Sequence, residues 1–440
     1  MSRAALAAGA FVAGALLGGC GDDDGEKASA APSPFLEFGA VLSLSGSGRD
    51  TGVAEQQGIR AAERHVNALG GVLGRPIRVT IVDDGSDPVA TNAAALGLLE
   101  RTLPLIIGPT GSDGAAALAD IIAAQRAVVI SSSATALGAG EPAGGSFFFR
   151  LTPSDAVQGR ALRLLAASRT PGTATQRCAS AAVVFSDDLY GKPIAAQFDA
   201  GFRQSFGQVL ASVPVPTDLQ PDATYVGVAA TVARSGAECQ LVVTRPDVAA
   251  SYLRAFQEAK ALTPNRDWST FLTIGGDALY TASFLVLSRE DPARPDSPSA
   301  AEGVFIVAPD ATPGGPAYNA FRQVYQAQNP GEPPPPFSAN AFDAVVLAAL
   351  AIEQAGGDLS AVAIREGLLR VSAAGRAYDA SSLVDAVQDL RRGRRINYAS
   401  ASGTTNVSAN GEVFSDFIVS PVVSGQFQTP VLRFSASELQ

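Results

Sequence analysis

The sequence of 440 residues has little of what most enzyme sites need: it contains one histidine, three cysteines, one tryptophan and one methionine. The histidine, His65, stands between Ala62 and Val66 in a segment of helical period, not at the end of a strand. A Ser-His-Asp triad needs an imidazole within hydrogen-bonding reach of its nucleophile, which this placement does not offer. One histidine and two separated internal cysteines also cannot supply a customary zinc ligand set. We therefore expect no metal site and no cofactor.

Other motifs of catalysis and of nucleic-acid binding are missing as well. The sequence has no G-x-S-x-G nucleophile elbow and no G-x-x-x-x-G-K-[ST] phosphate loop. The net charge is -10 and the pI about 4.8, and no cluster of Lys and Arg alternates with aromatic residues. Binding to a phosphate backbone would need such a basic footprint. The alternative class of protein is a secreted α/β hydrolase. Without these motifs we expect the chain not to be an enzyme, and without a basic footprint we expect it not to bind nucleic acid.

The N-terminus carries the only apolar stretch of a targeting kind. Arg3 precedes an uncharged run at 4–19 that is rich in small residues, which is typical of an export signal. A membrane-spanning helix needs about 20 predominantly apolar residues, and this run is shorter and soon followed by Asp22, Asp23 and Asp24. Residues 21–34 have a composition that cannot bury a core. We interpret 1–19 as a signal peptide and 20–34 as a flexible tether.

The signal ends in Leu17-Gly18-Gly19-Cys20, which resembles the bacterial lipobox. The resemblance implies that Cys20 is acylated and becomes the mature N-terminus. It also implies several acyl chains, which are enough for stable anchoring. The alternative is an ordinary signal peptide with an incidental cysteine. The first interpretation predicts an exported lipoprotein, held to a membrane by its lipid anchor alone, in the periplasm or at the cell surface.

The other two cysteines, Cys178 and Cys239, each stand two or three residues before an apolar run that is typical of a strand, at 181–185 and at 241–244. Equivalent ends of neighbouring strands would place them within bonding range. In an oxidising compartment a disulfide is then expected. Two buried free thiols are the alternative.

From Phe35 onward, short apolar runs alternate with longer segments of helical period. This pattern predicts an α/β fold with parallel sheets flanked by helices. The roughly 400 residues exceed what one core usually supports, so we expect two doubly wound lobes. We expect a helix at about 113–124. The expected strands are 38–44, 77–82, 105–107, 128–131 and 147–150 in the first series, and 181–185, 209–213, 241–244 and 271–274 in the second.

An ordered set of segments carries a family resemblance, although each piece alone is a weak signal. They are Leu42-Ser43-Leu44-Ser45-Gly46, the run Gly70-Gly71 to Gly74-Arg75-Pro76, Asp83-Asp84, Ile107-Gly108-Pro109, the run Ile130 to Thr135, Phe148-Phe149-Arg150, the run Ser186 to Gly191 and Phe342-Asp343-Ala344-Val345. From Phe35 to about Gly411 the chain resembles the type I periplasmic-binding family, in its Leu/Ile/Val-binding branch.

The resemblance implies an architecture and a function. Two lobes would be joined by three hinge strands, with the ligand cleft between them. The first lobe would hold 35–152 plus about 305–398, and the second 153–304 plus about 399–440. The protein would capture an amino acid or a similar small polar metabolite and deliver it to ABC permease subunits. A ligand-sensing receptor of the same fold is the alternative, because the sequence does not separate transport from sensing.

In parallel sheets, ligands bind beyond the carboxyl ends of the strands. At such positions the resemblance implies ligand contacts for Ser112, Ser133, Ala134, Thr135, Tyr190 and Asp277. Ser112 would contact an acidic group of the ligand, and Asp277 would pair with an ammonium. The alternatives are that Ser112 and Asp277 are only helix N-caps and that the Thr135 hydroxyl only satisfies a turn.

The chain departs from the family at one place in the expected cleft. Where the family often has an aromatic residue, this sequence has Thr51, with Arg49 and Asp50 beside it. Arg245, at the end of an expected strand, is a second candidate cation for the cleft. These residues favour a ligand more polar than a branched-chain amino acid, unless the two arginines are simply solvated.

Overall fold

The computed structural model describes residues 33–136, 146–167, 178–205, 207–310, 314–403 and 406–439. The chain divides into two units, Met1–Ser33 and Pro34–Gln440, and the second is described here. The predicted signal peptide, Cys20 and nearly all of the predicted tether lie outside the described residues. No helix of the described residues has the length and the apolar character that crossing a membrane requires.

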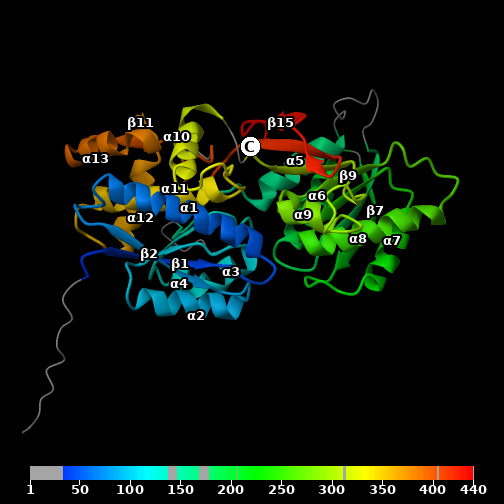
Figure 1. The fold of residues 1–440 in the computed structure, drawn as a ribbon, viewed down its shortest axis with the longest axis horizontal. Helices are drawn as coiled ribbons and strands as arrows, with labels where there is room; N and C mark the ends of the chain where they lie inside the picture. Colours follow the sequence, from blue (N-terminus) through cyan, green and yellow to red (C-terminus); the bar gives the residue numbers. More distant parts are fainter. Residues whose placement is uncertain are drawn as a thin grey trace, which may run out of the picture. The chain divides into compact units, whose positions relative to one another are not determined.

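The first sheet has five parallel strands in the order β2-β1-β3-β4-β5. Its strands are β1 (Leu36–Leu42), β2 (Ile77–Asp83), β3 (Leu105–Ile107), β4 (Val128–Ser131) and β5 (Phe148–Arg150). The helices that accompany it come from both halves of the chain, so blue and orange segments lie together in Figure 1. They are α1 (Arg49–Ala68), α2 (Pro88–Leu99), α3 (Ser112–Ala117), α4 (Ala119–Ala123), α10 (Gly315–Gln326), α11 (Ser338–Ala355), α12 (Ala361–Val371) and α13 (Leu383–Arg391), with the strand pair β11 (Arg376–Tyr378) and β12 (Ile396–Tyr398) and the 3-10 turn η3 (Ala380–Ser382).

The second sheet runs in the order β14-β13-β10-β9-β8-β6-β7, and β15 pairs with β13. Strands β6 to β10 are parallel to their neighbours, whereas β13 is antiparallel to β10. The strands are β6 (Ser180–Ser186), β7 (Gln208–Val215), β8 (Cys239–Val243), β9 (Leu272–Gly275), β10 (Val304–Pro309), β13 (Phe417–Val423), β14 (Gln426–Phe427) and β15 (Leu432–Phe434). The helices are α5 (Asp155–Ala167), α6 (Gly191–Gln204), α7 (Ala223–Arg234), α8 (Pro246–Ala259) and α9 (Ala282–Leu287), with the 3-10 turns η1 (Lys260–Leu262) and η2 (Asp277–Leu279).

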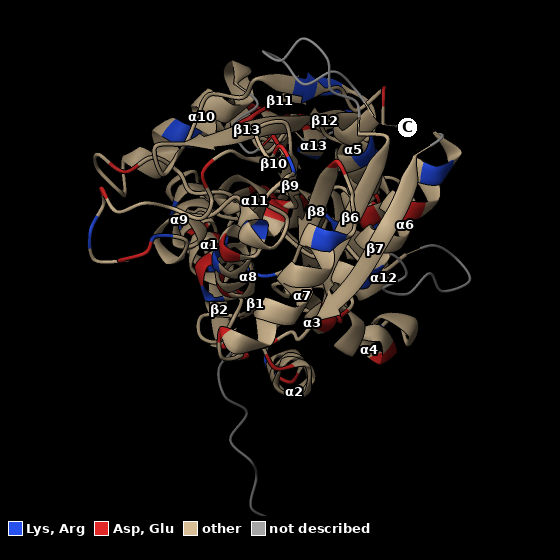
Figure 2. Cartoon of the chain, turned by 90° about the vertical axis from the view of Figure 1, so that its right-hand side faces the viewer, with Lys and Arg blue, Asp and Glu red and all other residues tan. Residues whose placement is uncertain are grey.

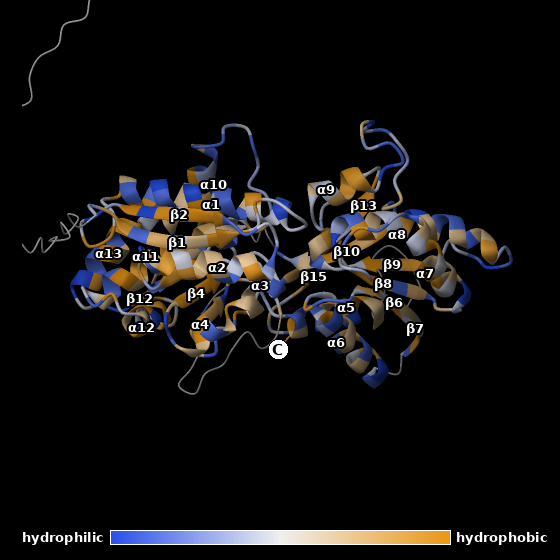
Figure 3. Ribbon diagram, turned by 90° about the horizontal axis from the view of Figure 1, so that it is seen from below, coloured by the Kyte–Doolittle hydropathy of each residue, from blue (hydrophilic) through white to orange (hydrophobic). Residues whose placement is uncertain are grey.

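Each lobe has its own apolar core. One cluster of buried side chains runs from Leu36 to Leu151 and again from Tyr318 to Val413. The second lobe has two clusters, and both take residues from the same two segments of the chain. Together these segments run from Val157 to Ala308 and from Phe417 to Leu439. Figure 3 shows the same division, with mostly orange strands such as β1 and β9 inside each lobe. The chain therefore crosses between the lobes three times.

The second and third crossings come later in the chain than expected. The family resemblance implied that the chain returns to the first lobe near 305 and to the second lobe near 399. Strand β10 pairs with β9 and β13, so it belongs to the second sheet. Val407 and Val413 still pack in the first cluster. Other elements also differ from expectation. The helix expected at 113–124 is interrupted at the buried Leu118. Strand β1 begins and ends two residues before the expected 38–44, and β8 begins at Cys239 rather than two residues after it.

The first and third crossings are held together next to the cleft. The Arg150 N–H donates to the Gly411 carbonyl at 3.0 Å, and its Nε lies 3.4 Å from Oε1 of Glu412. Gly411 has φ +77°, and a Cβ at this position would lie 1.9 Å from the Phe148 carbonyl oxygen. Only glycine fits such a left-handed position against another backbone. The buried guanidinium of Arg150 also donates to the Thr135 carbonyl at 2.8 Å, which links this crossing to the loop after β4.

Candidate functional site

A cavity of about 330 Å³ lies between the carboxyl ends of the strands of the two sheets. This volume is at the lower end of the range for small-molecule pockets. The first lobe contributes residues after β1, β2, β3 and β4, and the second contributes residues after β6, β8 and β9. The residues that line it include Arg49, Asp50, Thr51, Thr110, Ser112, Asp113, Ser133, Thr135, Tyr190, Arg245, Asp277, Leu287 and Phe337. Of the predicted contacts, only Ala134 is not among the residues that line the cavity.

On the second lobe, the buried Asp277 pairs with the partly buried Tyr190. The Tyr190 hydroxyl donates to Oδ1 of Asp277 at 2.7 Å, and Nε2 of Gln158 donates to the same oxygen at 2.6 Å. The Ala278 N–H is a third donor to Oδ1, at 2.9 Å. Burial raises the pKa of Asp277, although the hydrogen bonds from Gln158 and Tyr190 oppose the rise. All three donors reach Oδ1, so Oδ2 is the oxygen left for a ligand.

Asp155 lies beside this pair at the start of α5, and sequence reasoning missed it. Its side chain is fully buried, and neither carboxylate oxygen has a well-formed hydrogen bond within the described residues. Burial raises the pKa of Asp155 to about 7, with repulsion from Asp277 in the same direction, while the Thr135 hydroxyl and Arg150 oppose it. A buried carboxylate without a well-formed hydrogen bond is costly to ionise, and a nearby cationic group would relieve that cost.

The predicted residues of the first lobe lie on two loops that hold each other. Ser131 Oγ donates to the Pro109 carbonyl at 2.8 Å, and the Ala136 N–H donates to Ser112 Oγ at 3.1 Å. Ser112 is not an N-cap, because Gly111 occupies that position of α3. Asp277 is likewise the first residue of η2, with Gly276 as the N-cap. The hydroxyls of Ser112 and Thr135 both border the cavity.

Glu55 is a second residue that sequence reasoning missed. It stands on α1, is fully buried and accepts hydrogen bonds from Ser132, Ser133 and Thr110. The Ser133 hydroxyl is therefore occupied within the protein. A signal was available: Glu55 precedes Ile59 by four positions, so it lies on the apolar face of the helix. A carboxyl group on such a face must be neutralised or hydrogen-bonded.

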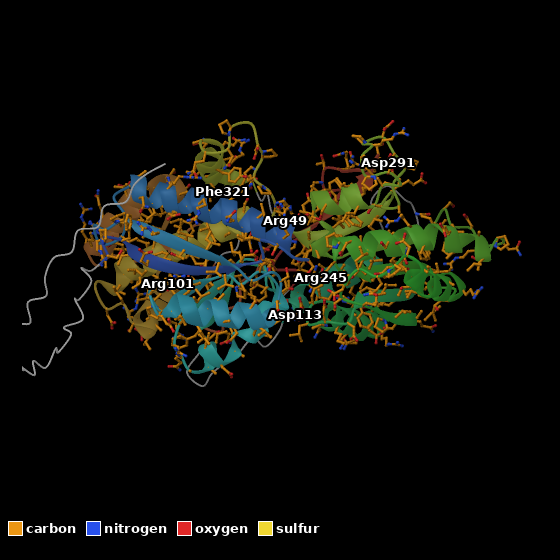
Figure 4. The ribbon with its side chains drawn as sticks, turned by 60° about the horizontal axis from the view of Figure 1, so that its bottom comes forward. Arg49, Arg101, Asp113, Arg245, Asp291 and Phe321 are labelled. Carbon is orange, nitrogen blue, oxygen red and sulfur yellow. A yellow bond between two sulfur atoms is a disulfide. The ribbon has the colours of Figure 1, made fainter. Side chains whose placement is uncertain are left out.

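Arg245 reaches from the second lobe to the first. Its guanidinium contacts the Ser47 hydroxyl and lies 3.5 Å from Oδ2 of Asp113 and 3.8 Å from Oδ2 of Asp188. Figure 4 shows Arg245 and Asp113 together where the lobes face each other, far from Arg101 on the first lobe and Asp291 on the second. In this arrangement the Arg245 charge is shared between protein carboxylates.

The cavity wall near the start of α1 is mixed in character. Arg49 and Asp50 form a loose, exposed pair 3.9 Å apart, and Thr51 lies beside them. Leu287 and Phe337 add apolar surface to the same cavity. Within the described ranges no group of three or more His, Cys, Asp or Glu side chains is arranged to hold a metal ion, and Figure 2 shows basic residues scattered over the elements rather than gathered on the face in view.

These observations describe a two-lobed α/β protein with a polar cleft at the strand ends. A family model described as "periplasmic binding protein" matches residues 36–378. The chain belongs to this family. The α/β fold with two parallel-sheet lobes and the family resemblance predicted from the sequence are both confirmed. Family members are binding proteins.

A curated relative and several solved structures are similar over most of the chain. The chemotactic signal transduction system substrate-binding protein BasB of Halobacterium salinarum is 25% identical over 401 residues, 90% of this chain and 88% of BasB. The branched-chain amino acid substrate-binding protein LivJ of Streptococcus pneumoniae, solved with isoleucine, has a TM-score of 0.68 at 20% identity, covering 90% of this chain and 98% of LivJ. A solute-binding protein of Rhodopseudomonas palustris, solved with benzoate, has a TM-score of 0.66 at 18% identity, covering 91% and 98%.

Proposed function

We propose that the protein is an extracytoplasmic solute-binding protein that captures an amino acid or a similar small polar metabolite and delivers it to an ABC permease. The observation that carries this proposal is the cavity between the lobes, which the hydroxyl-bearing residues Ser112 and Thr135 line from the first lobe and the buried Asp277 lines from the second. Such a site binds and orients a small molecule. The single histidine of the sequence, His65, does not line the cavity, so no imidazole is in reach to activate a serine there, and we expect no enzymatic activity.

The two sides of the cavity suit the two charges of a zwitterion. An ammonium group would lie against Oδ2 of Asp277, and its charge would also stabilise the ionised form of the neighbouring Asp155. The carboxylate of the ligand would accept hydrogen bonds from the hydroxyls of Ser112 and Thr135. The remaining residues that line the cavity would pack around the ligand. The isoleucine and the benzoate of the solved relatives have a carboxylate in common, which supports an acidic group in this ligand. Arg49 and Asp50 favour a more polar side chain than that of isoleucine.

The ligand would also control the shape of the molecule. Asp277 and Tyr190 belong to the second lobe, and Ser112 and Thr135 to the first. A ligand that contacts both sets binds better when the lobes are close, so binding and closure are linked.

Export and lipidation complete the proposal. Residues 1–19 would direct export, and acylated Cys20 would hold the protein to a membrane through the tether 20–34. Replacing Cys20 by Ser should then release the protein into the soluble fraction, measured by fractionation and immunoblotting. Continued membrane association of the variant would contradict the lipoprotein assignment.

Ligand sensing is the second candidate, favoured by the similarity to a chemotactic substrate-binding protein. In that case the closed form would be recognised by a receptor rather than by a permease. Uptake of radiolabelled ligand and swimming toward the same ligand, compared in a deletion strain, separate the two roles. Loss of uptake indicates transport, and loss of chemotaxis with normal uptake indicates sensing.

The test of the binding function is a thermal-shift screen of residues 34–440, which form one unit, against amino acids, small carboxylates and amides. A ligand present at 100 times its Kd should stabilise the folded protein by about 2.7 kcal/mol. A shift that saturates with concentration supports the proposal. If nothing in these three classes shifts the transition, the ligand class is wrong.

A further inference from the structure

One buried carboxylate connects three of the loops that build the first-lobe side of the cleft. Oε1 of Glu55 accepts hydrogen bonds from Ser132 Oγ at 2.6 Å and from Ser133 Oγ at 2.7 Å. Oε2 accepts from the Thr110 hydroxyl, which in turn accepts from the Ser43 N–H at 3.2 Å. Ser132 and Ser133 follow β4, Thr110 follows β3 and Ser43 follows β1. The three hydroxyl donors to Glu55 are separated from it by 55 or more positions in the sequence.

The position of Glu55 follows from a close approach of α1 to the loop after β1. A Cβ at Gly52 would lie 2.1 Å from the Ser43 carbonyl oxygen, so only glycine lets the first turns of α1 come this near. Three residues later, Glu55 points to the sheet and is fully buried. Burial raises its pKa, repulsion from Asp84 adds to this, and the three hydroxyls oppose it. The carboxyl group therefore depends on the hydroxyls of the loops after β3 and β4 for its solvation.

The loops depend on Glu55 in the same way. Thr110 and Ser133 line the cavity, and Ser133 also accepts from the Gly111 N–H at 3.4 Å. Thr135 follows two residues after Ser133. Without the carboxylate, three hydroxyls near the cavity would lose their acceptor at once. Because hydrogen bonds to an ionised group are stronger than neutral ones, the loops would lose their main shared support.

We propose that Glu55 is a positioning residue for ligand binding: it does not line the cavity, but it holds the loops after β1, β3 and β4 in the arrangement that the ligand requires. The expected effect of Glu55 on ligand affinity rests on the proposed binding function. The structural part of the proposal, the ordering of three loops by one side chain, stands without any ligand.

Glu353 provides a matched control in the same lobe. It is a glutamate on α11, buried to 6% exposure, and it accepts from the Leu73 N–H at 2.6 Å and from Arg391 Nη2 at 2.8 Å. None of these residues lines the cavity. Glu353→Gln thus removes a buried charge from the lobe core without touching the cleft loops.

The experiment compares amide hydrogen exchange of the parent, Glu55→Gln and Glu353→Gln without ligand. In Glu55→Gln we expect exchange about tenfold faster or more in peptides covering 108–114 and 131–136, because one lost charge-assisted hydrogen bond already changes an opening equilibrium that much. In Glu353→Gln these peptides should exchange as in the parent. Unchanged exchange in Glu55→Gln, or an equal increase throughout the first lobe, would overturn the inference.

A second variant covers the case in which Glu55→Gln does not fold. The double variant Thr110→Val, Ser132→Ala keeps the carboxylate and removes two of its donors, and it should show the same local increase in exchange. Calorimetry with L-isoleucine and L-serine then measures affinity. Where the parent binds either one, Glu55→Gln should bind it at least about tenfold more weakly, and unchanged affinity would overturn the inference. If the parent binds neither, the exchange data decide the role of Glu55, and only the amino-acid ligand is in question.

Discussion

Nη2 of Arg245 lies 3.5 Å from Oδ2 of Asp113, and this ion pair joins the second lobe to the first. Arg245 immediately precedes α8, and Asp113 lies in the first turn of α3. Their contact exists only while the lobes are close. Burial and the nearby Asp188 raise the pKa of Asp113, and Arg245 opposes the rise. The pair therefore favours the closed arrangement even before a ligand arrives.

Asp113→Asn should shift the protein toward the open form and weaken ligand binding modestly. A partly exposed ion pair contributes about 0 to 1 kcal/mol, which corresponds to at most roughly a fivefold change in apparent Kd. Calorimetry measures the affinity, and small-angle scattering measures the radius of gyration without ligand. Arg203→Gln, which breaks an exposed pair with Asp199 on α6, is the control. A change of a hundredfold would instead indicate that Asp113 contacts the ligand directly.

Asp277→Ala should weaken binding of an amine-bearing ligand by at least roughly thirtyfold, because losing a charged partner in a desolvated site typically costs about 2 to 5 kcal/mol. Thr135→Ala should weaken it less. The fold should survive both changes. Calorimetry on the ligand found by screening provides the affinities. Parent-like binding by both variants would show that the site is assigned wrongly although the family is right.

Tyr190, which is partly buried, can be tested against the fully buried Tyr252, whose hydroxyl also donates to a side chain. Tyr190→Phe removes the hydroxyl that donates to Asp277 and should weaken ligand binding, since the carboxylate loses one of its three donors. Tyr252→Phe removes a hydroxyl that donates to Gln240 at 2.5 Å, away from the cavity. Both changes should lower the free energy of unfolding by about 1 kcal/mol, but only the first should alter affinity. Equal affinities of the two variants would argue against a role for Tyr190.

Asp155 makes the stability of the ligand-free protein depend on pH. Its pKa rises from an ordinary value of 3.8 to about 7 on folding, so between these values the folded state retains a proton that the unfolded chain has lost. The free energy of unfolding should therefore fall as the pH rises from about 4 to about 7, with a slope of up to about 1.4 kcal/mol per pH unit from this group. Denaturant titrations at several pH values measure it.

Asp155→Asn should remove this contribution. The slope is best compared between pH 6 and pH 7. Burial also raises the pKa of Asp343, to about 6, so Asp343 contributes to the slope mainly below pH 6. A slope between pH 6 and 7 that is the same in the parent and the variant would refute the assignment to Asp155.

The Cys178–Cys239 disulfide, present in the structure with 5.9 Å between the Cα atoms, should be fully formed in the exported protein. It closes a loop of 61 residues, which the chain-entropy model values at about 4 kcal/mol. Alkylation under denaturing, non-reducing conditions should therefore modify neither thiol, and reduction should lower the melting temperature. Mass spectrometry that finds both thiols alkylated without reductant would exclude the bond.

Local sequence was sufficient for the strands, and the family resemblance supplied the candidate residues of the cleft. Strands such as β3 and β4 were predicted to the residue, because fully buried parallel strands are uninterrupted apolar runs. Tyr190 and Asp277 each follow a strand, and the family resemblance implied that they contact the ligand; both line the cavity. Glu55 and Asp155 were missed because both lie inside helical segments, where a carboxylate ordinarily faces solvent.

The sequence by itself determined the fold class and the end of the sheets at which the cavity forms, because apolar periodicity and strand order are local properties of the chain. Only the tertiary structure decided which polar groups are already occupied. Ser133 is bound by Glu55, Arg245 is shared between Asp113 and Asp188, and neither carboxylate oxygen of Asp155 has a well-formed hydrogen bond within the described residues. The physical reason is that hydrogen bonding and desolvation depend on which residues meet across tens or hundreds of positions, and no local pattern encodes those distances.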